Sequence, residues 1–101
     1  MNTTLPIELP YEKITEFCHQ YPIAKLSLFG SILRDDFRPD SDVDLLVEFT
    51  SDSKITYFDL VKMEIELTEM VGRKVDLRTP NELSHYFREA VLESAQPVYV
   101  Q

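Results

Sequence analysis

The sequence predicts an α/β (α+β) fold, with a small mixed β-sheet packed with helices. Segments with the 3.6-residue apolar period of amphipathic helices alternate along the chain with short apolar runs typical of strands. A chain of 101 residues is long enough for one hydrophobic core but not for two. No repeat, low-complexity tract or internal linker interrupts it. Residues 1–101 are therefore interpreted as a single compact domain.

The first predicted element is a helix at residues 8–20. Its apolar side chains recur at helical spacing and are expected to face the core: Ile14, Phe17, Cys18 and Tyr21. Because Cys18 lies on this stripe, it is interpreted as a small core residue rather than a reactive thiol.

Two strands are predicted next, at residues 24–29 and 42–49, and both alternate between apolar and other side chains. The Gly-Ser pair at 30–31 ends the first strand and opens a short helical turn at 32–35. Pro and Asp punctuate residues 38–41, which are therefore expected to form a loop.

The longest helix is predicted at residues 56–71, with one side facing the core: Leu60, Met63, Leu67, Met70 and Val71. Gly72 follows and is expected to be the C-terminal cap. Residues 74–78 are expected to form the third strand.

A last helix is predicted from Thr79, because Thr as N-cap, Pro80 at the first position and Glu82 at the third agree as start signals. It is expected to end near residues 96–97, before a short strand at 98–100. Its inward side chains would be Leu83, Phe87, Ala90 and Val91.

Composition and charge narrow the classes of function. The net charge is −8 and no basic cluster offsets it, which argues against nonspecific binding to nucleic acid. A basic protein partner is compatible with this charge. No apolar run approaches the length of a membrane span, and the N-terminus lacks the pattern of a signal peptide. With a single cysteine in the sequence, a reducing cytoplasm is the expected compartment.

Three aspartates are predicted to converge at one edge of the sheet. Asp42 and Asp44 are two residues apart on a strand and so point to the same face. If the first two strands are antiparallel neighbours, Gly30 and Ser31 lie beside these carboxylates. A strand, the long helix and another strand form a βαβ unit, which favours a parallel third strand and brings Asp76 level with them.

This set of residues suits phosphate chemistry with a metal ion. Three adjacent carboxylates cannot all stay charged without cations, and oxygen-only ligands favour Mg²⁺ over zinc. A Gly-Ser turn lets backbone N–H groups approach a phosphate, and Arg34 could reach the same phosphates. The sequence therefore predicts that a metal-bound nucleoside triphosphate is used for group transfer.

These residues also have other interpretations. An EF-hand loop starting at Asp40 fails, because its sixth position is Leu45 rather than glycine. Asp42 could be a turn residue. Arg34 could be a surface ion-pair partner rather than a phosphate ligand, and Arg78, on the face of Asp76, could border the nucleotide or not.

Gly30-Ser31, Arg34, Ser41-Asp42, Asp44 and the later Asp76 resemble the G-S-x-x-R…S-D-x-D signature of the DNA polymerase β-like nucleotidyltransferases. The short chain resembles the minimal nucleotidyltransferase (MNT) group within them. One departure is Asp35, which stands where a small residue commonly follows the arginine.

The resemblance implies a nucleotidyltransferase fold and an assignment of roles. Asp42 and Asp44 would hold two Mg²⁺ ions, and Asp76 would share one metal and help to deprotonate the attacking hydroxyl. Gly30 and Ser31 would bind the β- and γ-phosphates, with Arg34 nearby. A nucleoside monophosphate would be transferred and pyrophosphate released.

Chains of this kind are similar to the antitoxins of type VII-like HEPN–MNT toxin–antitoxin modules. The resemblance implies transfer of AMP from ATP to a tyrosine of the cognate HEPN ribonuclease toxin, with which the chain would form a hetero-oligomer. The alternative left open is a binding antitoxin that blocks the toxin by complex formation, with the metal site secondary.

Overall fold

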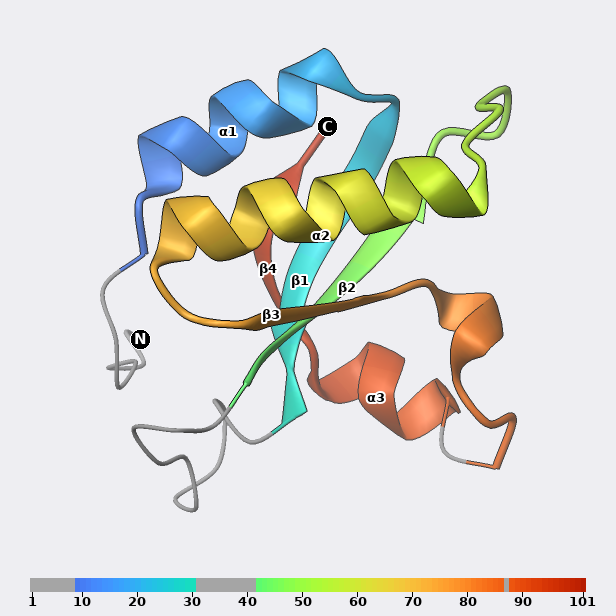
Figure 1. The fold of residues 1–101 in the computed structure, drawn as a ribbon. Helices are drawn as coiled ribbons and strands as arrows, with labels where there is room; N and C mark the ends of the chain where they lie inside the picture. The colour runs from blue at the N-terminus through green and yellow to red at the C-terminus, as the bar shows by residue number, and fades with distance from the viewer. Residues whose placement is uncertain (1–8, 31–41, 87) are drawn as a thin grey trace.

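Four strands form one mixed sheet, and helices α1 and α2 pack over one of its faces (Figure 1). The computed structural model of the protein describes residues 9–30, 42–86 and 88–101. In chain order the described elements are α1 (Tyr11–Gln20), β1 (Ile23–Phe29), β2 (Val43–Phe49), α2 (Tyr57–Val71), β3 (Val75–Arg78), the 3₁₀ turn η2 (Pro80–Glu82), α3 (Arg88–Ser94) and β4 (Gln96–Val100).

The strands of the sheet lie in the order β3-β2-β1-β4. β1 runs antiparallel to both β2 and β4, whereas β2 and β3 are parallel. These pairings confirm the predicted antiparallel contact of the first two strands and the predicted parallel βαβ unit. Since β3 and β4 are at opposite edges, the η2–α3 segment connects one edge of the sheet to the other.

The main hydrophobic core lies between the sheet and helices α1 and α2. α1 contributes the predicted Ile14, Phe17 and Cys18, and α2 contributes Met63 and Leu67. The inner strands and β3 add every second residue: Leu26, Leu28, Val43, Leu45, Val47, Val75 and Leu77. The intervening side chains of β2 and β3 therefore point to the opposite face of the sheet.

Burial raises the pKa of two side chains, the Cys18 thiol in α1 and the Tyr21 hydroxyl at its C-terminal end. Burial raises the pKa of the Cys18 thiol to about 12, which fits its predicted role as a core residue. The Tyr21 hydroxyl donates a hydrogen bond of 2.6 Å to Glu66 Oε2 of α2. Burial and this carboxylate raise the pKa of Tyr21 to about 12, which extends the pH range over which the hydroxyl donates the bond that links the two helices.

Local signals define both ends of α2. At its start Thr56 and Asp59 form a capping box, in which Thr56 N–H donates to Asp59 Oδ2 at 3.0 Å and Asp59 N–H donates to Thr56 Oγ1 at 3.3 Å. At its end Gly72 adopts a left-handed backbone with φ of 80°, which confirms the predicted cap.

Side chains of α2 also satisfy the outer edge of β3. Thr68 Oγ1 accepts a hydrogen bond from Val75 N–H at 3.0 Å, and Glu64 Oε2 accepts one from Leu77 N–H at 2.8 Å. Val75 and Leu77 are two residues apart, and residues of an edge strand at this spacing direct their N–H groups away from the sheet. Residues four apart on a helix lie on one face, so a single side of α2 fixes the position of β3.

The prediction of one long last helix is wrong. η2 ends after one turn, and Leu83 then has an extended backbone (φ −84°, ψ 145°). The predicted capping interaction is present, since Glu82 Oε1 accepts a hydrogen bond from Thr79 N–H at 2.9 Å, but it serves only this turn. Leu83 is buried, which confirms its predicted inward position, although it reaches the interior from an extended backbone. A single helical turn is only marginally stable, so burial of this leucine side chain outweighs continuation of the helix.

Because the predicted helix is interrupted between η2 and α3, the side chains of α3 that face inward also differ from those predicted. Val91 is half-buried, but Ala90 is exposed, so its predicted inward position is wrong. Phe87 lies outside the described residues. α3 begins at Arg88 and buries none of its residues fully. Counting helical turns from Thr79 therefore does not give the side of α3 that faces the protein.

The last strand is longer than predicted, because β4 begins at Gln96 rather than at residue 98. Pro97 pairs with Ser27 of β1. β4 lies at the edge of the sheet, where a residue without an N–H group is tolerated. Among the described residues, no helix has both the length and the apolar character needed to cross a membrane.

Truncation of the α2 core residue Leu67 to alanine is expected to lower the free energy of unfolding by about 2–5 kcal/mol, because it leaves a cavity under the helix. Ile65→Ala is the control in the same helix, since Ile65 is 55% exposed and should change stability by less than about 0.5 kcal/mol. Denaturant titration measures both. Equal losses in the two variants would contradict this packing.

Candidate functional site

Asp44 and Asp76 lie directly beside each other on neighbouring parallel strands. They are register partners in the β2–β3 ladder, as are Val43 and Val75 before them. Adjacent strands are about 4.8 Å apart, so the two carboxylates share one small region on the face opposite the core. Asp42 lies one residue before β2 and is half-buried. The structure therefore confirms that Asp76 is level with Asp44, as the sequence predicted.

Gly30 brings the backbone at the end of β1 against the Asp44 carboxylate. Phe29 is the register partner of Asp44, so the next residue of the chain lies beside it. Gly30 has a φ of 79°, a conformation that side chains rarely adopt. A Cβ atom at this position would overlap Asp44 Oδ2. Only glycine therefore fits both the backbone and the space, and the predicted neighbourhood of Gly30 and Asp44 is confirmed.

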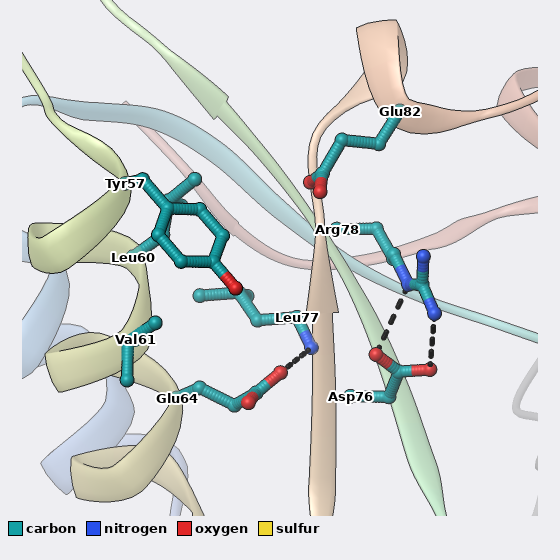
Figure 2. Close-up of a pocket in the computed structure, with 8 residues that line it drawn as sticks. All are labelled: Tyr57, Leu60, Val61, Glu64, Asp76, Leu77, Arg78 and Glu82. Carbon is teal, nitrogen blue, oxygen red and sulfur yellow. Dashed lines mark hydrogen bonds and ion pairs between the residues drawn. The ribbon is translucent and has the colours of Figure 1, made fainter.

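Arg78 holds the Asp76 carboxylate through two hydrogen bonds. Nε donates to Oδ1 at 3.0 Å and Nη2 donates to Oδ2 at 3.3 Å (Figure 2). The hydrogen bonds and the charge of Asp76 raise the pKa of Arg78 above its usual value, and Glu82 and Asp44 act in the same direction. Arg78 therefore supplies positive charge at the Asp76 carboxylate, and whether it borders the nucleotide stays a prediction.

A hollow of about 210 Å³ adjoins this ion pair at the edge of the sheet. Figure 2 shows Asp76 and Arg78 on one side of β3 and the α2 side chains on the other. The hollow is lined by Tyr57, Leu60, Val61, Glu64, Asp76, Leu77, Arg78 and Glu82. It thus connects the carboxylate site with the outer surface of α2.

The other predicted site residues are placed as follows. Ser31, Arg34 and the predicted turn and loop at 32–35 and 38–41 lie outside the described residues. In the described part of the chain, no three His, Cys, Asp or Glu side chains are grouped as a metal ion would require. The structure brings together Asp44, Asp76 and Gly30. The predicted convergence of Asp42 with the other two aspartates is not seen among the described residues, and the metal-binding roles of all three stay a prediction.

The residues present nevertheless fit a magnesium ion in their chemistry. Asp44 and Asp76 offer carboxylate oxygens, the ligands that Mg²⁺ prefers, and Mg²⁺ needs only one or two of them from a protein. Gly30 leaves room at Asp44 that any side chain would fill.

Two features of the site had little signal in the sequence. The spacing of Asp76 and Arg78 predicted that both side chains share a face, but not that they form an ion pair. No sequence pattern indicated the hydrogen bond that Glu64 accepts from β3, because this bond depends on how α2 lies over the sheet.

Comparisons with known proteins give the same interpretation of the fold. Residues 11–98 match the nucleotidyltransferase domain family. The chain is 33% identical over 86 residues to MJ0435 of Methanocaldococcus jannaschii, a candidate protein adenylyltransferase, with 85% of this chain and 90% of that protein aligned. It is 31% identical over 85 residues to the protein adenylyltransferase MntA of Thermococcus cleftensis, with 84% and 82% aligned.

Solved structures share the architecture. A candidate minimal nucleotidyltransferase superposes with a TM-score of 0.71 at 32% identity, covering 86% of this chain and 87% of that one. The complex of a tri-AMPylated Shewanella oneidensis HEPN toxin with its MNT antitoxin matches with a TM-score of 0.65 at 17% identity, covering 90% and 70%. At that identity the second likeness shows a common fold.

Substitution of Gly30 by alanine is expected to cost more stability than the same change at Gly72. Both glycines have φ near 80°, where an alanine costs about 1–2 kcal/mol, but only Gly30 has Asp44 against it, whereas a Cβ at Gly72 meets nothing within 4 Å. The difference between the two losses in free energy of unfolding, measured with denaturant, therefore gives the cost of the overlap with Asp44 apart from the backbone strain that both variants share. Amide shifts by NMR should change around Asp44 in Gly30→Ala alone. Equal effects of the two variants would refute the close approach.

Proposed function

Because this chain belongs to the nucleotidyltransferase domain family, we propose that it transfers AMP from ATP to a tyrosine of a cognate HEPN ribonuclease toxin and so acts as its antitoxin. The observation that carries the proposal is the alignment of Asp44 with Asp76 beside the close backbone approach at Gly30. Relatives named protein adenylyltransferases and the shared fold of an antitoxin bound to its AMPylated toxin support it.

In this proposal Asp42, Asp44 and Asp76 would be the side chains that hold two Mg²⁺ ions. The ions, when bound, offset the charge of the triphosphate and of the attacking and leaving oxygens. The backbone at Gly30 and Ser31 binds the β- and γ-phosphates, and Arg34 contributes a guanidinium to them. On a protein with a net charge of −8, such local cations would reduce the electrostatic repulsion of ATP.

The transfer is a displacement at the α-phosphorus. The tyrosine oxygen forms a bond to the α-phosphorus, the bond from that atom to the bridging oxygen breaks, and pyrophosphate leaves. Asp76 takes the phenolic proton, which a free tyrosine holds with a pKa of about 10. Holding the hydroxyl in line with the leaving group contributes most of what the chain's own residues can add.

The partner and compartment follow from the same proposal. The acceptor is a protein. The chain and the HEPN toxin form a hetero-oligomer whose lifetime is sufficient for the transfer to occur. Both are placed in the cytoplasm, where ATP and Mg²⁺ are available and a lone cysteine stays reduced.

Exchange of Asp42 and Asp44 for asparagine is expected to abolish transfer, because the amides keep the shape of the side chains but remove the charge that holds the metal. Intact-mass analysis of purified toxin, after incubation with ATP and Mg²⁺, should show added AMP with the parent chain and none with Asp42→Asn/Asp44→Asn. Asp52→Asn is the control, since Asp52 is exposed beyond the opposite end of β2 and should leave transfer unchanged.

The same pair of variants separates the catalytic antitoxin from the binding antitoxin. If Asp42→Asn/Asp44→Asn still neutralises the toxin fully and the parent chain adds no AMP, the chain inhibits by complex formation. Loss of both neutralisation and mass gain supports the catalytic role.

Exchange of Arg78 for glutamine is expected to tighten binding of Mn²⁺, used as a probe for Mg²⁺, in the absence of nucleotide. The guanidinium competes with the metal for Asp76, and because the two side chains are 46% and 30% exposed the competition is screened by solvent. An exposed ion pair is worth about 0.2–1 kcal/mol, so the gain should be at most about fivefold. Titration followed by electron paramagnetic resonance measures it. Arg78→Lys, which keeps the charge, should gain less, and a weaker affinity in Arg78→Gln would contradict the competition.

A further inference from the structure

An apolar stripe on α2 faces away from the core. Tyr57 is 71% exposed, Phe58 84%, Val61 37% and Ile65 55%. They recur at the spacing of one face of a helix, opposite the side on which Met63 and Leu67 are buried. Exposed apolar side chains gathered on one face mark an interaction surface more often than scattered ones do.

The stripe is continuous with the carboxylate site. The hollow of about 210 Å³ that contains Asp76 is also lined by Tyr57 and Val61. A second hollow of about 340 Å³ is lined by Ile65 and Val75 among others, and Glu64 lines both. The two hollows lie next to each other along the border of α2 and the edge strand β3, on either side of the Glu64 side chain, and this border is here called the α2/β3 groove. A protein bound along it would have one end at Asp76.

The groove is not suited to the addition of a strand. The outward N–H groups of Val75 and Leu77, which a new strand would need as donors, are already bonded to Thr68 and Glu64. An occupant must therefore bind through side chains, and the exposed ridge of α2 beside a hollow suits an amphipathic helix.

The charges of the groove favour a basic binding partner over a second copy of this chain. Its acidic side chains outnumber its basic ones: Glu64, Glu69, Asp76 and Glu82 against Lys74 and Arg78. A second copy of this chain would also carry a net charge of −8, so self-association would bring like charges together. A partner with Lys or Arg at the rim of its apolar surface is complementary.

We propose that the α2/β3 groove docks the acceptor protein of the transfer reaction, which presents an amphipathic helix with apolar side chains for the stripe and basic residues for the rim. The proposal rests on the function proposed above, because it names the surface that this acceptor uses. Docking there places the acceptor's reacting hydroxyl at the Asp76 end of the groove.

The test measures binding and transfer separately with the cognate HEPN toxin. Phe58→Glu and Ile65→Glu should each raise the toxin Kd by about tenfold or more in calorimetry, and should raise KM for the toxin while kcat at saturating toxin is retained. Phe58→Ser, which adds no charge, should weaken binding in the same direction. Tyr11→Glu is the matched control, since Tyr11 is a 48% exposed aromatic residue on α1, outside the groove, and its toxin Kd should stay unchanged.

Binding of a fluorescent ATP analogue with Mg²⁺ reports that the variants remain folded and that the nucleotide site is intact. If the stripe variants bind the toxin as the parent chain does, or if Tyr11→Glu weakens binding equally, the groove is not the docking surface. If the stripe variants instead abolish self-association seen by ultracentrifugation without changing toxin binding, the groove binds a second copy of this chain and the proposal is wrong.

The docking surface and the proposed function can fail separately. Weakened toxin binding by the stripe variants, together with no AMP transfer by the parent chain, would support the docking surface and contradict the proposed function.

Discussion

The register of β3 against β2 is the constraint on which the candidate site depends. Side chains of a strand alternate between faces, so a slip of one residue would turn Asp76 into the core and bring Val75 or Leu77 out beside Asp44. The apolar residues on either side of Asp76 oppose such a slip, because both are buried. The bonds from β3 to Thr68 and Glu64 oppose it from outside the sheet.

Helix α2 therefore serves the site through each of its faces. Its inner side buries Met63 and Leu67, its β3 side satisfies the edge strand, and its outer side carries the exposed stripe. The helix needs well-defined ends for this, which the Thr56–Asp59 capping box and Gly72 provide. A shift of α2 along its axis would disturb the core, the register of β3 and the α2/β3 groove together.

The negative charge at the site is offset in part by Arg78. Asp44 and Asp76 share a small region on a protein that is already strongly acidic, and Arg78 offsets part of their charge. The ion pair is partly exposed, so exchange of Arg78 for another cation costs little. The Asp76 carboxylate can therefore change partners without the cost of breaking a buried salt bridge.

Local patterns in the sequence determined the helices α1 and α2, the first three strands and the face on which the aspartates lie, because periodicity and chain connectivity suffice for these. They also determined the nucleotidyltransferase resemblance and the proximity of Gly30 to Asp44. Only the tertiary structure decided the bond from Glu64 to β3, the ion pair of Asp76 with Arg78 and the break at Leu83. The first two depend on distances in space, and the third on competition with burial: the start signals at Thr79, Pro80 and Glu82 favoured a helix through Leu83, yet packing of Leu83 against the rest of the chain outweighed them.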